Sequence, residues 1–180
     1  LTILVAARDN PEEVSRTLGS IVGGMKASDF EVVVLDDSNS NEVEIVCEEW
    51  ASIYSPVYYL RCEGKGLAAA WNLGIEKTDG KYIWFLNSGD DSTKGAVEIV
   101  QAHTGSNHDI LVFQYFVESE RGKKSIFRLP RLFICEDDLM RSVLPSHQAV
   151  VFRRESLETA ELRYDEALRI SADTDLFFRT

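Results

Sequence analysis

The sequence contains no apolar run near the roughly 18–20 residues of a membrane-spanning helix, so we expect no integral membrane protein. Basic residues are also scarce: 19 Lys and Arg against 30 Asp and Glu give a net charge of −11. This charge argues against a nucleic-acid or anionic-membrane binder, because neutralising phosphate requires clustered Lys and Arg. We therefore expect no nucleic-acid partner and at most peripheral association with a membrane.

Cysteine is rare, and the three residues Cys47, Cys62 and Cys135 are odd in number. No two of them have the spacing of metal ligands, so we expect free thiols in a reducing compartment. We accordingly expect a cytoplasmic protein that works in solution or at the inner face of the membrane. The chain starts at Leu1 rather than Met and stops at Thr180 inside an expected helix, so we expect a piece of a longer protein.

Hydrolase signatures are also absent. The sequence has no Gly-x-Ser-x-Gly motif and only three histidines, and no Ser/His/Asp or Cys/His arrangement can be built from it. His103 and His108 flank a helix end, where a solvated His is common. His147 precedes a short apolar strand, where a structural hydrogen bond is as good an interpretation as a functional role.

The residues that are present describe one α/β domain. A chain of 180 residues, 44% hydrophobic and 10% aromatic, suffices for a single core. Its first half alternates strand and helix patterns four times. The expected strands are Thr2–Ala6, Glu31–Leu35, Val57–Cys62 and Tyr82–Leu86, and the expected helices are one opening at Asn10-Pro11 and those at Val43–Ser52, Leu67–Lys77 and Gly95–His103. The strands are nearly all continuously apolar, which predicts a parallel sheet between two helix layers.

The second half has a different pattern. We expect a long strand Ile110–Val117 with a hairpin partner at Ser125–Arg128, a short acidic helix Cys135–Arg141, a strand Ala149–Phe152 and a final helix Ala172–Thr180. The predicted fold class is therefore α/β, with a Rossmann-like, mainly parallel central sheet and a smaller antiparallel or mixed addition.

Charged and polar residues follow the expected strands. Parallel strands place their carboxyl ends on one edge of the sheet, where ligands bind. Four acids, Asp36, Asp37, Asp90 and Asp91, are therefore expected to converge there beside Arg8 and Lys65. Hard oxygen ligands favour Mg²⁺ or Mn²⁺ between such carboxylates. The alternative is that these acids are ordinary turn residues.

A glycine-rich loop follows the third expected strand. Gly64-Lys65-Gly66-Leu67-Ala68-Ala69 matches G-x-G-x-x-A, the pattern of dinucleotide-binding loops. The residue about 20 positions on, which would bind the ribose, is near Asn87 rather than an acid. The loop thus predicts either a plain tight turn or a backbone that approaches a phosphate, and it argues against a dinucleotide-binding oxidoreductase.

Two further acids open the last expected helix. Asp173 and Asp175 follow Ser171, and by spacing alone this is a helix-capping pattern.

Taken in order, several motifs resemble the GT-A-fold glycosyltransferases of family 2 over nearly the whole chain. They are Thr2–Ala6 with Thr17-Leu18 and Ser20-Ile21, Val34–Asn39, Gly66–Ile75, Gly80–Asp90, His147-Gln148, Tyr164-Asp165-Glu166 and Ile170–Asp173. The Asn87-Ser88-Gly89-Asp90 form resembles members that build bacterial surface polysaccharides such as capsule, exopolysaccharide or O-antigen.

The resemblance implies an enzyme that transfers a sugar, with inversion, from a nucleotide-diphosphate sugar to a hydroxyl of a carbohydrate or lipid-linked acceptor. It implies one domain over residues 1–180, with a nucleotide-binding half at 1–105 and an acceptor-side half at 106–180 that is cut short at its end. The residues it implies are Ala6, Arg8, Asp36, Asp37, Gly66 and Asn87 for the nucleotide, Asp90 for a Mn²⁺ or Mg²⁺ ion, His147 for the acceptor side and Asp173 as the general base.

The sequence departs from the family pattern in two places. The Asp-x-Asp motif is Asn87-Ser88-Gly89 here, so Asp90 is the nearest acid for a metal, and Ala172 stands where Glu is usual. An alternative to the enzyme is thus a catalytically weakened nucleotide-sugar-binding domain.

Overall fold

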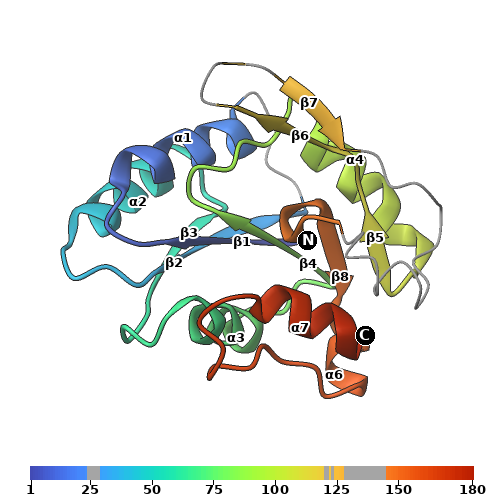
Figure 1. The fold of residues 1–180 in the computed structure, drawn as a ribbon. Helices are drawn as coiled ribbons and strands as arrows, with labels where there is room; N and C mark the ends of the chain where they lie inside the picture. Colours follow the sequence, from blue (N-terminus) through green and yellow to red (C-terminus); the bar gives the residue numbers. More distant parts are fainter. Residues whose placement is uncertain (24–28, 120–121, 123, 128–144) are drawn as a thin grey trace.

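A computed structural model describes residues 1–23, 29–119, 122, 124–127 and 145–180 (Figure 1). Its main sheet has six strands in the order β3-β2-β1-β4-β8-β5. Their bounds are β1 Thr2–Ala7, β2 Glu31–Asp36, β3 Val57–Arg61, β4 Tyr82–Asn87, β5 Ile110–Val112 and β8 Val150–Arg153. Strands β3, β2, β1 and β4 are parallel, whereas β8 runs antiparallel to β4 and to β5. The predicted α/β fold class with a mainly parallel sheet is confirmed.

Helices cover both faces of this sheet (Figure 1). On one face lie α1 (Pro11–Val22), α2 (Glu42–Ile53) and α4 (Ala96–His103). On the other lie α3 (Leu67–Lys77), α6 (Arg154–Thr159) and α7 (Ala172–Arg179). Short 3-10 helices occur at η1 (Thr104–Ser106) and η2 (His147–Ala149).

The continuously apolar strands explain the two layers. Alternate side chains of a strand point to opposite faces of the sheet. Ile3 and Val5 of β1 pack into the core with α1, α2 and α4, whereas Leu4 and Ala6 pack into the core with α3, α6 and α7. Both sides of β1 are therefore buried, as the sequence predicted for a parallel sheet.

The expected long strand Ile110–Val117 is wrong, because the chain breaks it into two. Its start, β5, pairs with β8, and this pairing ends at Val112 opposite Val150. The chain then leaves the main sheet as β6 (Tyr115–Glu118) and pairs antiparallel with β7 (Lys124–Phe127). The hairpin partner is thus confirmed within one residue. The expected helix Cys135–Arg141 lies outside the described residues.

The helix expected to open at Asn10-Pro11 begins there. Asn10 holds the N-cap position of α1, but its side chain makes no cap hydrogen bond to the helix backbone. Its Nδ2 instead donates to Glu13 Oε2 and to Ser88 Oγ, both at 2.7 Å. This residue therefore ties the start of α1 to the loop after β4.

Candidate active site

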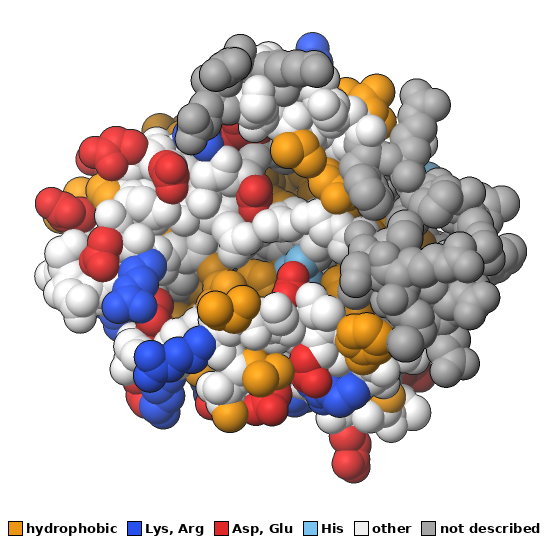
Figure 2. All heavy atoms as spheres, in the orientation of Figure 1, with side chains coloured by type: hydrophobic (Ala, Val, Ile, Leu, Met, Phe, Trp, Pro, Cys, Tyr) orange, Lys and Arg blue, Asp and Glu red, His pale blue; other side chains and the backbone are white. Residues whose placement is uncertain are grey.

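Three parallel strands end beside one another at the edge of the sheet where the polar loops were expected. The backbone N–H of Asp37 donates to the carbonyl of Ala7 at 2.9 Å, and that of Ser88 donates to the carbonyl of Ala6 at 2.8 Å. A cavity of about 940 Å³ opens at this edge. Figure 2 shows a hollow near the middle of the corresponding face, bordered by hydrophobic side chains.

The structure brings most of the predicted site residues to this cavity. Its lining includes Ala6, Arg8, Asp37, Gly66, Asn87, His147 and Asp173. Asp36 and Asp90 are not among the lining residues. The cavity extends from the loops after β1 and β2 to the helix α7, so one site combines both halves of the chain.

Asp37 presents a carboxylate oxygen without a partner. Its side chain is only 7% exposed. Oδ2 accepts the backbone N–H of Gly66 at 3.2 Å, whereas Oδ1 is buried and has no hydrogen-bond partner among the described residues. A buried carboxylate oxygen without a donor is costly, so a ligand N–H or O–H at this point would be bound favourably.

Asp36 points the other way, and its predicted place in the site is not supported. It is fully buried, with Oδ2 accepting the Tyr59 hydroxyl at 2.8 Å and lying 3.2 Å from Arg61 Nη1. Its Oδ1 accepts the backbone N–H of Ser38 at 2.9 Å. Neighbouring residues of a strand face opposite sides, so Asp36 holds β2 to β3 while Asp37 faces the cavity.

The expected convergence of four acids is therefore wrong. Asp91 is exposed and pairs with Arg16 at 3.1 Å, away from the cavity. Asp90 Oδ2 accepts the backbone N–H of Asn87 at 2.9 Å, and its carboxylate also hydrogen-bonds the side chain of Gln148. Asp90 thus lies directly behind Asn87 and Gln148, which line the cavity. Burial raises the pKa of Asp90.

Gly66 allows the loop after β3 to approach Asp37. Its φ of +97° and ψ of 177° are open to glycine and strained for residues with a Cβ. It occupies the N-cap position of α3, and its N–H reaches the Asp37 carboxylate.

We expect Gly66→Ala to lower the free energy of unfolding by about 1–3 kcal/mol, because Ala is strained at this φ and ψ. No atom within 4 Å would meet the added Cβ, so the cost is conformational rather than steric. Chemical denaturation measures the change. As a control we propose Gly105→Ala, at a glycine that also has open space and no positive φ, which should change stability by less. Equal effects of the two substitutions would contradict this account.

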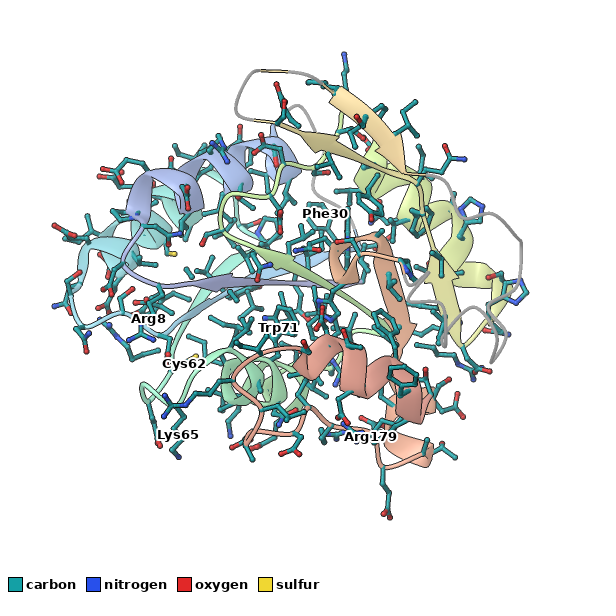
Figure 3. All side chains as sticks on the ribbon, in the orientation of Figure 1. Arg8, Phe30, Cys62, Lys65, Trp71 and Arg179 are labelled. Atoms are coloured by element: carbon teal, nitrogen blue, oxygen red, sulfur yellow. The ribbon has the colours of Figure 1, made fainter. Side chains whose placement is uncertain are left out.

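A cluster of aromatic rings packs between β4 and α3. Trp71 of α3 stacks on His147 with ring centroids 4.1 Å apart, and Phe85 and Tyr164 pack around the pair. His147 Nε2 lies 2.5 Å from the Tyr164 hydroxyl. Asn72 fixes Tyr164 in turn, because its side chain bonds both the N–H and the carbonyl of Tyr164 at 2.9 Å. Figure 3 labels Trp71 between the sheet and the helices α3 and α7.

Asp173 lies in the first turn of α7 and lines the cavity. Its Oδ1 accepts the backbone N–H of the next residue, Thr174, at 2.8 Å. The cap position belongs to Ser171, whose side chain makes no cap hydrogen bond. The predicted capping pattern therefore lies at the first turn of α7, and Asp173 of this turn lines the cavity.

The cavity is far less acidic than the whole chain. Three basic residues, Arg8, Lys65 and Arg169, line it together with three acids, Asp37, Glu166 and Asp173. Figure 3 labels Arg8 and Lys65 on the same side of the molecule. The formal charge of the lining is thus 3 − 3 = 0, so an anionic ligand there would lie near cations despite the net charge of −11.

Sequence reasoning placed Trp71, Gln148 and Tyr164 in family-like motifs without a site role and left out Arg169; all four line the cavity. Trp71 stands in the Ala-rich helix that the sequence predicted, where a tryptophan among small side chains was the available signal. Its place at the cavity depends on contacts with His147 and Tyr164, which lie 76 and 93 residues further along the chain, since 147 − 71 = 76 and 164 − 71 = 93.

The cysteines are consistent with free thiols. Cys47 and Cys62 are buried and form no disulfide, and burial raises the pKa of each thiol to about 12. Cys135 lies outside the described residues.

A model of the family described as glycosyl transferase family 2 matches residues 2–158. The chain belongs to this family. The prediction of a glycosyltransferase domain from the ordered motifs is thereby confirmed.

Similar proteins support the assignment. The chain is 23% identical to the minor teichoic acid biosynthesis protein GgaB of Bacillus subtilis, over 82% of this chain and 17% of GgaB. The solved structure of S. aureus TarS 1-349 in complex with UDP-GlcNAc matches with a TM-score of 0.78 and 18% identity, over 99% of this chain and 52% of that one. The mannosyltransferase PcManGT from Pyrobaculum calidifontis, in complex with GDP-Man and Mn²⁺, matches with a TM-score of 0.66 and 14% identity, over 96% of this chain and 50% of that one.

The family model shows the family, and the structural matches show the GT-A type of fold. The chain spans about half or less of the length of each of these proteins. Within the described part of the chain, no helix has the length and apolar character needed to cross a bilayer.

Proposed function

We propose that this domain is an inverting glycosyltransferase that moves a sugar from a nucleotide-diphosphate sugar to a hydroxyl acceptor in bacterial polysaccharide biosynthesis. One observation carries the proposal: a single cavity joins Asp37, at the end of β2, to Asp173, on α7 beyond β1 and β4. Two carboxylates with separate surroundings suit two tasks, binding a base and accepting a proton. Residues 1–105 supply the nucleotide half and residues 106–180 the acceptor side, to which we assign His147.

The nucleotide would lie along the loops after β1, β2 and β3. Asp37 Oδ1, which has no partner among the described residues, would accept an N–H of the base. Ala6 and Gly66 would allow the nucleotide to approach the backbone, and Arg8 and Asn87 would face the ribose and phosphates. TarS was solved with UDP-GlcNAc and PcManGT with GDP-Man, which supports a sugar nucleotide as the donor.

Asp173 would act as the general base. It lines the cavity on the α7 side, where a hydroxyl of a carbohydrate or lipid-linked acceptor would enter. A carboxylate there takes the proton as the hydroxyl oxygen attacks the anomeric carbon. Attack from the face opposite the leaving diphosphate inverts the configuration at that carbon.

The proposal includes a divalent ion, Mn²⁺ or Mg²⁺, because the resemblance to the family implies one. Such ions are held by one or two carboxylates together with substrate phosphates. The described residues contain no group of three or more His, Cys, Asp or Glu that could hold a metal. Asn87 lines the cavity and its side-chain oxygen is a hard ligand, whereas Asp90 lies behind it and would hold the ion through a metal-bound water. When bound, the ion would neutralise charge on the leaving diphosphate.

We expect Asp90→Asn to abolish the Mn²⁺-dependent part of the thermal stabilisation by a nucleotide and to reduce turnover sharply. Asn keeps an oxygen that can accept the Asn87 N–H, so the loop should remain folded. Asp91→Asn is the matched control, because Asp91 pairs with Arg16 on the surface. Full activity of the wild-type protein in a chelator would exclude the metal role.

A thermal-shift panel tests the proposed function. The probes are UDP-, GDP- and dTDP-sugars, each with and without Mn²⁺, and NAD. A ligand that binds only the native state raises its stability, by about 2.7 kcal/mol at 100 times its Kd. We expect at least one sugar nucleotide to stabilise the protein more than NAD does. Stabilisation by NAD alone would favour a dinucleotide-binding oxidoreductase. Binding without turnover would indicate a weakened sugar-nucleotide-binding domain.

The free thiols are consistent with a cytoplasmic enzyme, and we place it there, in solution or peripherally at the inner face of the membrane.

A further inference from the structure

Buried polar atoms without partners concentrate at the cavity. Among the described residues four side-chain atoms are buried without a hydrogen bond: Asp37 Oδ1, Trp71 Nε1, His147 Nδ1 and Arg153 Nε. The first three belong to residues that line the cavity. Buried polar groups in folded proteins are nearly always satisfied, so such a concentration points to a ligand. The proposed base accounts for Asp37 and leaves Trp71 and His147 unexplained.

Trp71 and His147 cannot satisfy each other. Their rings are stacked at 4.1 Å with planes only 12° apart. A ring N–H lies in the plane of its ring, so two stacked rings direct their hydrogens sideways rather than at one another. Trp71 is 3% exposed and His147 4% exposed, so bulk water does not satisfy these atoms either. Neither atom thus has a partner among the described residues, and both belong to residues that line the cavity.

The surroundings of His147 decide which of its nitrogens carries the proton. Burial lowers the pKa of His147 to about 3, so the imidazole is neutral and carries one proton. Burial raises the pKa of Tyr164 well above its usual value, so its hydroxyl keeps its proton. That hydroxyl lies 2.5 Å from Nε2 of His147. The Tyr164 hydroxyl is buried and has no other hydrogen-bond partner among the described residues, so its proton goes to Nε2, which places the imidazole proton on Nδ1. Nδ1 of His147 and Nε1 of Trp71 are then both donors.

We infer that Trp71 Nε1–H and His147 Nδ1–H bind an oxygen of the sugar that is transferred, either a ring hydroxyl or an acyl carbonyl. The inference rests on the proposed function. It also refines the acceptor-side role of His147, because it places this residue against the sugar as the sugar passes from donor to acceptor.

Position and chemistry both favour the sugar over the phosphates. Trp71 lies on α3, and the N-cap of this helix, Gly66, donates a hydrogen bond to Asp37 at the nucleotide end. His147 is hydrogen-bonded to Tyr164, and the negative charge of Asp173 contributes to the raised pKa of Tyr164. The pair thus lines the same cavity as the base-binding residue and the proposed general base, with neighbours at each of them. Two neutral donors in an aromatic wall suit a neutral oxygen, because burying a phosphate there would cost its hydration.

Trp71→Phe tests the inference, since Phe keeps an aromatic ring against His147 and removes the Nε1 donor together with part of the indole. Calorimetry on the full-length protein would measure the Kd of the sugar nucleotide that stabilises it most and of the matching nucleotide diphosphate. We expect sugar-nucleotide affinity to fall about 5- to 100-fold and nucleotide-diphosphate affinity to stay within about twofold. Trp50→Phe is the matched control, because Trp50 Nε1 donates to Ser15 on the other face of the sheet. It should change neither affinity.

The outcomes separate this inference from the proposed function. An equal loss of both affinities in Trp71→Phe, or no loss of either, would overturn the role of the pair. A wild-type protein that binds neither ligand would instead overturn the proposed function.

A second measurement does not depend on the folding of Trp71→Phe. Nitrogen-15 NMR of the His147 side chain in the wild-type protein should show the proton on Nδ1. In Tyr164→Phe, which removes the hydroxyl that fixes the tautomer, we expect a mixture of tautomers and a selective loss of sugar-nucleotide affinity. A proton found on Nε2 in the wild-type protein would overturn the inference.

Discussion

Asp173→Asn should lower the turnover of sugar transfer by about 10²–10⁴-fold, the usual contribution of a general base. Asn keeps the shape of Asp and an oxygen that can accept the Thr174 N–H, so the start of α7 should stay intact. It cannot take a proton from the acceptor hydroxyl. Folding and donor affinity should therefore remain near wild type while turnover falls, as steady-state kinetics on the full-length protein would show.

Asp175→Asn is the matched control for this prediction. Asp175 is on the same helix, pairs with Arg179 at 2.6 Å and is not among the residues that line the cavity. We expect it to keep near wild-type turnover. Near wild-type turnover of Asp173→Asn would show that Asp173 has only a structural role.

The second large effect concerns nucleotide affinity. Asp37→Ala should weaken nucleotide binding by about 1.5–3 kcal/mol, the scale of a hydrogen bond to a charged group. The reason is the buried Oδ1, which has no partner among the described residues and belongs to a residue that lines the cavity. Isothermal titration calorimetry with the nucleotide diphosphate measures the loss. Equal affinities of the two proteins would refute the assignment.

Asp36→Asn provides a control at the neighbouring position. Asp36 is fully buried and bonds Tyr59 and Arg61 rather than the cavity. We therefore expect its replacement to lower the free energy of unfolding by about 1–3 kcal/mol and to leave nucleotide affinity in the folded protein nearly unchanged. Replacing Asp37 should thus lower nucleotide affinity, whereas replacing Asp36 should lower the stability of the fold.

The alternation of strand and helix was readable in the sequence because each strand is apolar on both faces. That pattern predicted the parallel part of the sheet and, through it, the edge at which Arg8, Asp37 and Asn87 meet. It did not predict the break between β5 and β6. The break depends on where β8 stops pairing with β5, and β8 lies about forty residues further along the chain.

The site was predicted less completely than the fold. The period of two along β2 allows only one of Asp36 and Asp37 to face the cavity, but the sequence does not show which face holds it. Nor does it show that Asp90 lies behind Gln148, because that contact joins distant elements. The same holds for Trp71, whose proposed role depends on its stacking with His147, a contact that only tertiary packing creates.

The most direct test of the central claim is to incubate the full-length protein with the sugar nucleotide that stabilises it most and with a hydroxyl acceptor. Released nucleotide diphosphate and the anomeric configuration of the product would be followed by NMR. The account predicts that nucleotide diphosphate is released in step with a product of inverted configuration, and that Asp173→Asn slows both. A product of retained configuration, or binding by the wild-type protein of NAD but of no sugar nucleotide, would contradict it.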